Sequence, residues 1–192
     1  MCIMNVIAVP IIWWCWLIFI VYWVITAFKL KTVVERQDCG ASLVYKAPTI
    51  LGGALLWYDG WPGSLRWELT PHNDITYALG SRAAVAGLWV AIWARRTLAG
   101  NWSSNITLKQ GHELVRTGPY RFARHPIYTG LLLMALGTAI AAGRVHYWLG
   151  LVFFFTGFWI KLKGEERLML RHFPDQYPAY RKEVKAIIPF VL

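Results

Sequence analysis

The sequence predicts an all-α fold, a polytopic membrane helix bundle of about five transmembrane helices. The 192 residues are 57% hydrophobic and only 16% charged, with a mean hydropathy of +0.40. A soluble domain averages about half apolar and a quarter charged residues. The apolar residues fall into five runs, and a spanning helix uses about 20 residues. We therefore expect residues 1–192 to form a single integral-membrane domain.

The first apolar run, residues 3–28, is the clearest, because it is almost continuous and ends before Lys29. It is too long for a signal peptide and no basic segment precedes it, so it predicts a retained span. A weaker second run covers about residues 47–61. Within it, Gly52 and Gly53 lower helix propensity but permit close helix contact.

The third run covers residues 75–98 and contains Arg82, which either extends to the lipid headgroups or has a function. The fourth and fifth runs, residues 127–142 and 146–160, are joined by a very short turn and predict an antiparallel helical hairpin. We expect small side chains of the fourth run to form the packing surface of this hairpin, namely Gly130, Ala135, Gly137 and Ala139.

The basic residues predict the orientation in the membrane. The formal charge is +10, and seventeen of the twenty basic residues follow the first, third or fifth run. Cytoplasmic segments carry an excess of Lys and Arg, so these three segments are expected in the cytoplasm. The N-terminus is then outside and the C-terminus inside.

Several function classes are excluded by the sequence. It has no Gly-x-Gly-x-x-Gly turn, no phosphate-binding Gly-x-x-x-x-Gly-Lys loop and no alternation of strand and helix patterns, so a doubly wound cofactor domain is not expected. Its basic residues flank membrane spans, which argues against nucleic-acid binding. The three cysteines form no Cys-x-x-Cys pair, and we predict no metal site. Any chemistry must use helix ends and loops.

Polar residues gather in two cytoplasmic segments that meet in the predicted hairpin. Pro126 suits the first turn of a helix, which places His125 just before that helix and Tyr128 near its cytoplasmic end. Lys161 and Glu165, four residues apart, share one helix face beyond the fifth run. The hairpin should therefore bring His125 and Glu165 together. Taken alone, His125 reads as a helix cap and Glu165 as a solvated charge.

In these two segments the sequence resembles the integral-membrane methyltransferases typified by isoprenylcysteine carboxyl methyltransferase, with phospholipid N-methyltransferases as relatives. The resemblance covers about residues 101–189. It rests on three motifs in family order: Arg124-His125-Pro126-x-Tyr128-x-Gly130, Glu165-Glu166-x-x-Leu-x-x-x-Phe173 and Tyr177-x-x-Tyr180. It implies S-adenosylmethionine as methyl donor, held in a cytosolic pocket by residues 99–192. Residues 1–98 would give the acceptor access.

The resemblance also implies roles for individual residues. Glu165 would bind the donor from one arm of the hairpin, and Lys161 stands where the family has a substrate-facing arginine. Lysine keeps the positive charge of arginine but lacks the planar guanidinium that binds a carboxylate through two N–H groups. Asn105 stands where the family has a glutamine. The other implied donor contacts are His112, Leu114, Val115, Tyr120, His125 and Tyr128, and the catalytic pair is Lys161 and Glu165.

The function expected from this resemblance is methylation of a lipophilic acceptor, first of all a prenylcysteine-like carboxyl group that becomes a methyl ester. Three alternatives stay open: a phospholipid amine N-methyltransferase, an NADPH-binding protein similar to sterol reductases, and a lipid-binding membrane protein without catalysis. Expected partners are a lipophilic or lipidated substrate and membrane lipid.

Overall fold

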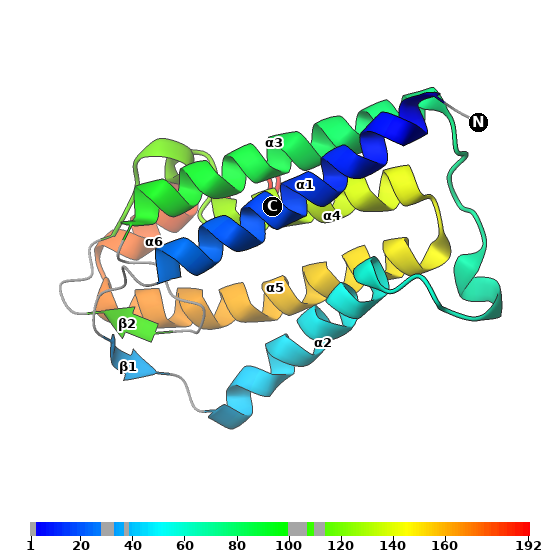
Figure 1. Cartoon of the computed structure of the whole chain (residues 1–192). Helices are drawn as coiled ribbons and strands as arrows, with labels where there is room; N and C mark the ends of the chain where they lie inside the picture. The colour runs from blue at the N-terminus through cyan, green and yellow to red at the C-terminus, as the bar shows by residue number, and fades with distance from the viewer. Residues whose placement is uncertain (1–2, 28–32, 37–38, 100–106, 110–113) are drawn as a thin grey trace.

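The computed structural model describes residues 3–27, 33–36, 39–99, 107–109 and 114–192. Long helices run alongside one another as a bundle, as predicted (Figure 1). These helices are α1 (Ile3–Ala27), α2 (Cys39–Trp57), α3 (Asp74–Leu98), α4 (Pro126–Ala142) and α5 (Val145–His172). Shorter helical elements are η1 (Gly63–Arg66), η3 (Gly118–Arg121) and α6 (Gln176–Glu183).

Two short strands were not predicted. β1 (Val33–Arg36) follows α1, β2 (Thr107–Lys109) follows α3, and the two pair antiparallel. Strands of four and three residues are too short to give a recognisable alternation of apolar and polar residues. The pair joins the segments that follow α1 and α3 at one end of the bundle (Figure 1).

The bundle is that of a membrane protein. Within the described ranges, the helices long and apolar enough to cross a membrane are Ile7–Ala27, Asp74–Leu98 and Val145–His172, and the apolar α4 is shorter, with 17 residues. Large apolar side chains point outward along these helices; Trp14 is 60% exposed and Trp89 is 62% exposed. Such surfaces suit lipid rather than water. Five as the number of spans stays a prediction.

The predicted limits hold for α3 and α4 within one residue, but those of the second helix are wrong. α2 begins at Cys39, eight residues before the predicted start, and ends at Trp57. Lys46 and Pro48 interrupt the apolar pattern, although Pro48 lies inside the helix. The predicted end at residue 61 is too late, because Pro62 disfavours a helical backbone at Trp61.

Two of the four small residues predicted to pack α4 on α5 face another helix. Gly130 and Gly137 face α3, where a side chain on Gly130 would lie 2.7 Å from the backbone nitrogen of Ala91, and one on Gly137 equally close to that of Ala84. Glycine allows the two backbones to approach in this way. α4 and α5 are nevertheless antiparallel neighbours, joined at Gly143, whose φ of 70° ends α4. The hairpin is confirmed, but the closest approach of α4 is to α3.

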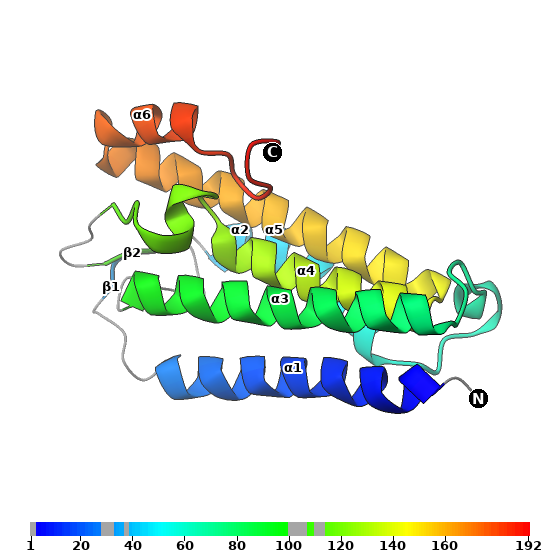
Figure 2. The same ribbon diagram turned by 90° about the horizontal axis from the view of Figure 1, so that it is seen from above.

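The predicted close contact at Gly52 is confirmed, and its partner is α5. A side chain on Gly52 would lie 2.8 Å from the carbonyl oxygen of Gly150 and 2.6 Å from the Phe154 ring. Viewed from above, α1, α3, α4 and α5 follow one another across the bundle (Figure 2). α2 packs mainly on α5, whereas α1 packs mainly on α3.

Two arginines of α3 have different environments. Arg82 is exposed on the helix surface. Arg95, which the sequence offers only as an orientation signal, is 3% exposed. It donates to the carbonyl oxygens of Ala99 at 2.6 Å and of Thr26 at 2.9 Å. Arg95 therefore links the end of α1 to the end of α3.

Candidate functional site

The predicted meeting of His125 and Glu165 is confirmed. Nδ1 of His125, the residue before α4, lies 3.5 Å from Oε2 of Glu165 on α5. The Tyr128 hydroxyl donates to Oε1 of Glu165 at 2.7 Å, and Nζ of Lys161 lies 3.7 Å from the same oxygen. The start of α4 and one face of α5 thus bring four predicted site residues together.

Aromatic rings cover one side of this cluster. The rings of His125 and Tyr128 stack with centroids 5.5 Å apart, and Tyr128 stacks on Phe158 at 4.9 Å. Nζ of Lys161 lies 5.5 Å from the Tyr128 ring centroid and 5.9 Å from that of Tyr45 on α2. Both distances are within the range of cation–π attraction. Tyr45 belongs to no motif, so sequence reasoning missed it.

A second carboxylate, Glu166, lies behind the first and is only 3% exposed. Its Oε1 accepts from Arg124 Nε at 2.9 Å and from Arg124 Nη2 at 2.6 Å. Oε1 also lies 3.5 Å from Nε2 of His125. A buried ion pair must be well hydrogen-bonded to repay its desolvation, and this one is. Arg124 and Glu166 belong to the motifs that carry the resemblance, but the resemblance implies no role for them.

The segment after α6 is bound to the loop before α4. The backbone nitrogens of Arg124 and His125 each donate at 2.8 Å, to the carbonyl oxygens of Lys185 and Ala186 respectively. The Arg124 guanidinium donates to the Val184 carbonyl oxygen, and the Thr129 hydroxyl to that of Ile187. The C-terminal segment therefore fixes the backbone position of His125.

Tyr120, a predicted donor contact, is buried at the same end of the bundle. Its carbonyl oxygen accepts from the Tyr180 hydroxyl. Burial raises the pKa of Tyr180 to about 12, although the nearby Arg124 and Arg116 lower it. Burial likewise raises the pKa of Tyr120. Both hydroxyls therefore stay protonated at neutral pH, and the Tyr180 hydroxyl is a hydrogen-bond donor rather than a base.

His125 is held in a charged environment. Burial lowers its pKa, but the carboxylates of Glu165 and Glu166 raise it more, so that the pKa stands above the usual 6.5. Each ring nitrogen faces one carboxylate, at 3.5 Å in both cases. The imidazolium carries a proton on both nitrogens, so it suits this position better than either neutral tautomer.

The remaining predicted donor contacts come from the segment before η3. Leu114 and Val115 are half-buried, and Val115 packs against the core. Asn105 and His112 lie outside the described residues. The structure thus brings together His125, Tyr128, Lys161 and Glu165, with Tyr120 buried beside them.

Comparison with known proteins covers the central part of this arrangement. A family model described as phospholipid methyltransferase matches residues 75–176, more than half of the chain. The chain belongs to the phospholipid methyltransferase family. The family segment extends from α3 into the start of α6 and contains the cluster of His125, Tyr128, Lys161 and Glu165. Tyr45 and the C-terminal segment that fixes His125 lie beyond it.

Curated relatives match parts of this chain. The protein-S-isoprenylcysteine O-methyltransferase of Saccharomyces cerevisiae is 29% identical over 119 residues, which is 59% of this chain and 48% of the relative. That of Schizosaccharomyces pombe is 36% identical over 81 residues, 42% of this chain and 34% of the relative. The cobalt-zinc-cadmium resistance protein CzcN of Cupriavidus metallidurans is 28% identical over 66% of this chain and 55% of its own length. The chain spans about half the length of the curated relatives it matches.

Proposed function

We propose that this chain is an S-adenosylmethionine-dependent methyltransferase that methylates a prenylcysteine-like carboxyl group to a methyl ester. The observation that carries the proposal is the convergence of His125, Tyr128, Glu165 and Lys161 at one end of the bundle. Membership of the phospholipid methyltransferase family supports methyl transfer as the reaction. Relatives named as isoprenylcysteine methyltransferases support the acceptor class.

The side chains of the cluster fit the proposed donor. When bound, S-adenosylmethionine supplies an electrophilic methyl group on a cationic sulfonium, together with an ammonium and ribose hydroxyls. The aromatic faces of Tyr120 and Tyr128 suit the cation, and the Glu165 carboxylate suits the ammonium or the hydroxyls. His125 and Tyr128 orient Glu165 through its two oxygens. Residues 99–192 would then form the donor half.

Lys161 is the proposed contact for the acceptor. Its ammonium lies between the rings of Tyr45 and Tyr128, beside Glu165. An acceptor carboxylate is already ionised at neutral pH and needs no base, so the protein chiefly has to align it with the methyl group. Residues 1–98 would hold the lipid tail. We place this end of the bundle in the cytoplasm, because seventeen basic residues follow the first, third and fifth apolar runs.

Donor binding tests the proposal directly. Purified Glu165→Gln protein should bind S-adenosylmethionine at least tenfold more weakly in calorimetry, because hydrogen bonds to a charged group contribute about 1.5–3 kcal/mol. Glu183→Gln is the matched control, since that carboxylate is 64% exposed and pairs only with the surface Arg116 among the described residues. Equal affinity in both variants would contradict the assignment of Glu165.

Product analysis tests the acceptor. Membranes incubated with methyl-labelled donor should incorporate base-labile label, as expected of a methyl ester, and Lys161→Ala should lose this label while it still binds the donor. Base-stable label in phospholipid would instead indicate amine methylation. Binding of NADPH in place of S-adenosylmethionine would indicate the reductase alternative, and binding of neither a protein without catalysis.

A further inference from the structure

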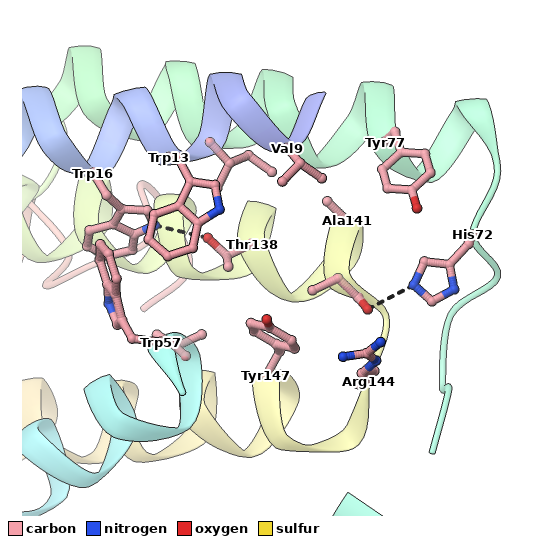
Figure 3. A pocket seen from close by; sticks show the side chains of 13 residues that line it. Val9, Trp13, Trp16, Trp57, His72, Tyr77, Thr138, Ala141, Arg144 and Tyr147 are labelled. Carbon is pink, nitrogen blue, oxygen red and sulfur yellow. Dashed lines mark hydrogen bonds between the residues drawn. The ribbon is translucent and has the colours of Figure 1, made fainter. Parts of the chain in front are cut away.

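A cavity of about 250 Å³ lies between helices at the other end of the bundle. α1, α2, α3, α4 and α5 all contribute to its lining, as does the segment that precedes α3 (Figure 3). Along α4, Thr138 in this cavity is ten residues beyond Tyr128, a rise of about 15 Å. Along α5, Tyr147 is fourteen residues before Lys161, or about 20 Å. The cavity is therefore separate from the proposed methyl-transfer site.

One end of the cavity is a wall of indole rings. Trp57 meets Trp13 with ring centroids 5.0 Å apart and Trp16 at 5.6 Å, both edge to face. The Trp16 indole nitrogen donates to the Thr138 hydroxyl at 3.1 Å, which satisfies its polar atom and leaves apolar ring surface toward the cavity. Trp13 is 52% exposed, so this wall continues onto the outer, apolar surface of the bundle. A hydrocarbon chain fits such a wall.

The other end of the cavity is polar. Figure 3 shows Arg144 and His72 at the end opposite the tryptophans. Nη1 of Arg144 donates to Oδ1 of Asp59 at 2.6 Å, and Asp59 is 59% exposed, so it can turn toward solvent. Nε2 of His72 lies 3.0 Å from the Ala142 carbonyl oxygen. A guanidinium presents several N–H groups in one plane and suits a phosphate.

We propose that this cavity, the tryptophan pocket, binds one membrane phospholipid, with an acyl chain against Trp13, Trp16 and Trp57 and the phosphate at Arg144. The polar end of the pocket lies where α4 ends and α5 begins, the end of the bundle at which a headgroup is expected. Trp13 is ten residues, about 15 Å, inside α1, so the indole wall lies deeper, where an acyl chain would run. The pocket is smaller than the roughly 300–1,000 Å³ of a site that encloses a whole ligand. It therefore encloses part of the lipid, and the rest of the chain lies along the apolar surface.

Lipid retention by the purified full chain tests this site. Native mass spectrometry on delipidated protein in detergent, with added dioleoylphosphatidylcholine, should show one lipid retained. Dioleoylglycerol, which has the same chains without phosphate, should be retained about tenfold less. Inorganic phosphate alone should neither bind nor displace the lipid, because it has no hydrocarbon chain to pack against the tryptophan rings. Equal retention of the two lipids, or displacement by phosphate, would overturn the proposal.

Two pairs of variants locate the lipid. Trp13→Ala should retain about tenfold less phosphatidylcholine than Trp14→Ala, whose tryptophan is 60% exposed on the same helix and does not line the pocket. Arg144→Gln should likewise retain about tenfold less phosphatidylcholine than Arg82→Gln, which changes an exposed arginine of α3. Equal retention within either pair refutes the site. Lys161→Ala should retain the lipid fully, which separates this site from acceptor binding at the proposed active site.

Discussion

At the scale of single residues, the neighbours of a side chain determine what it can do. Glu165 and Glu166 are adjacent in sequence, yet they have different surroundings. Glu165 faces Tyr128 and Lys161, whereas Glu166 is enclosed by Arg124. His125 joins the two carboxylates. We therefore assign Glu166 to holding the site in place and Glu165 to the proposed donor contact.

The elevated pKa of His125 predicts a pH-dependent stability. Because the pKa of this group is raised above 6.5 in the folded protein, its stabilising effect is complete below pH 6.5 and is lost as the pH rises through the folded pKa. Thermal unfolding between pH 6 and 9 should show stability falling with pH in the wild type. His125→Gln should remove this component of the fall.

The exposed His172, in the last turn of α5, provides the control. His172→Gln should keep the wild-type dependence on pH. If His125→Gln and the wild type respond to pH in the same way, the charged state of His125 does not stabilise the fold.

At the scale of elements, glycine positions decide which helices touch. Gly130 and Gly137 place α4 against α3, and Gly52 places α2 against α5. The sequence reveals these small residues but not the helices that they contact. The short turn between α4 and α5 makes α5 the obvious neighbour to predict for α4. Between α4 and α5, the rings of Tyr128 and Phe158 stack at 4.9 Å and occupy the space between the two helices. The close backbone contact of α4 therefore forms with α3.

A single methyl group at Gly130 should reveal the contact between α3 and α4. Gly130→Ala places a carbon 2.5 Å from the Gly87 carbonyl oxygen and should lower the free energy of unfolding by about 1–3 kcal/mol. The loss should appear as a lower melting temperature in detergent.

Gly53→Ala is the matched control, since its added carbon would lie 3.7 Å from the Phe154 ring, an ordinary contact. It should be neutral or slightly stabilising, because alanine favours a helix over glycine. A Gly130→Ala protein as stable as the Gly53→Ala protein would contradict the observed packing of α4 on α3.

At the scale of the whole molecule, the two proposed sites lie at opposite ends of one bundle. The candidate active site lies where α4 begins and where α5 continues toward α6, and the tryptophan pocket lies where α4 ends and α5 begins (Figure 1). The short strands and the C-terminal segment gather at the first end. The proposed orientation assigns that end to the cytoplasm, where a water-soluble methyl donor is available.

Cysteine labelling tests this orientation. In a background with the three native cysteines changed to serine, Ser64→Cys places an exposed thiol in η1 and Glu183→Cys places one at the end of α6. An impermeant maleimide should label the Ser64→Cys protein in intact cells and the Glu183→Cys protein only after permeabilisation. The reverse pattern would invert the proposed orientation.

The amino-acid sequence is enough to predict the helical membrane class, the limits of α3 and α4, the hairpin and the meeting of His125 with Glu165. Each follows from local rules, because apolar length and a proline at a helix start depend on neighbouring residues in the chain. The packing of α4 on α3, the hold of Arg124 and the C-terminal segment on His125, and the position of Tyr45 beside Lys161 emerge only in the folded structure. These contacts join residues far apart in sequence. They depend on how side chains of different helices fill the space between them.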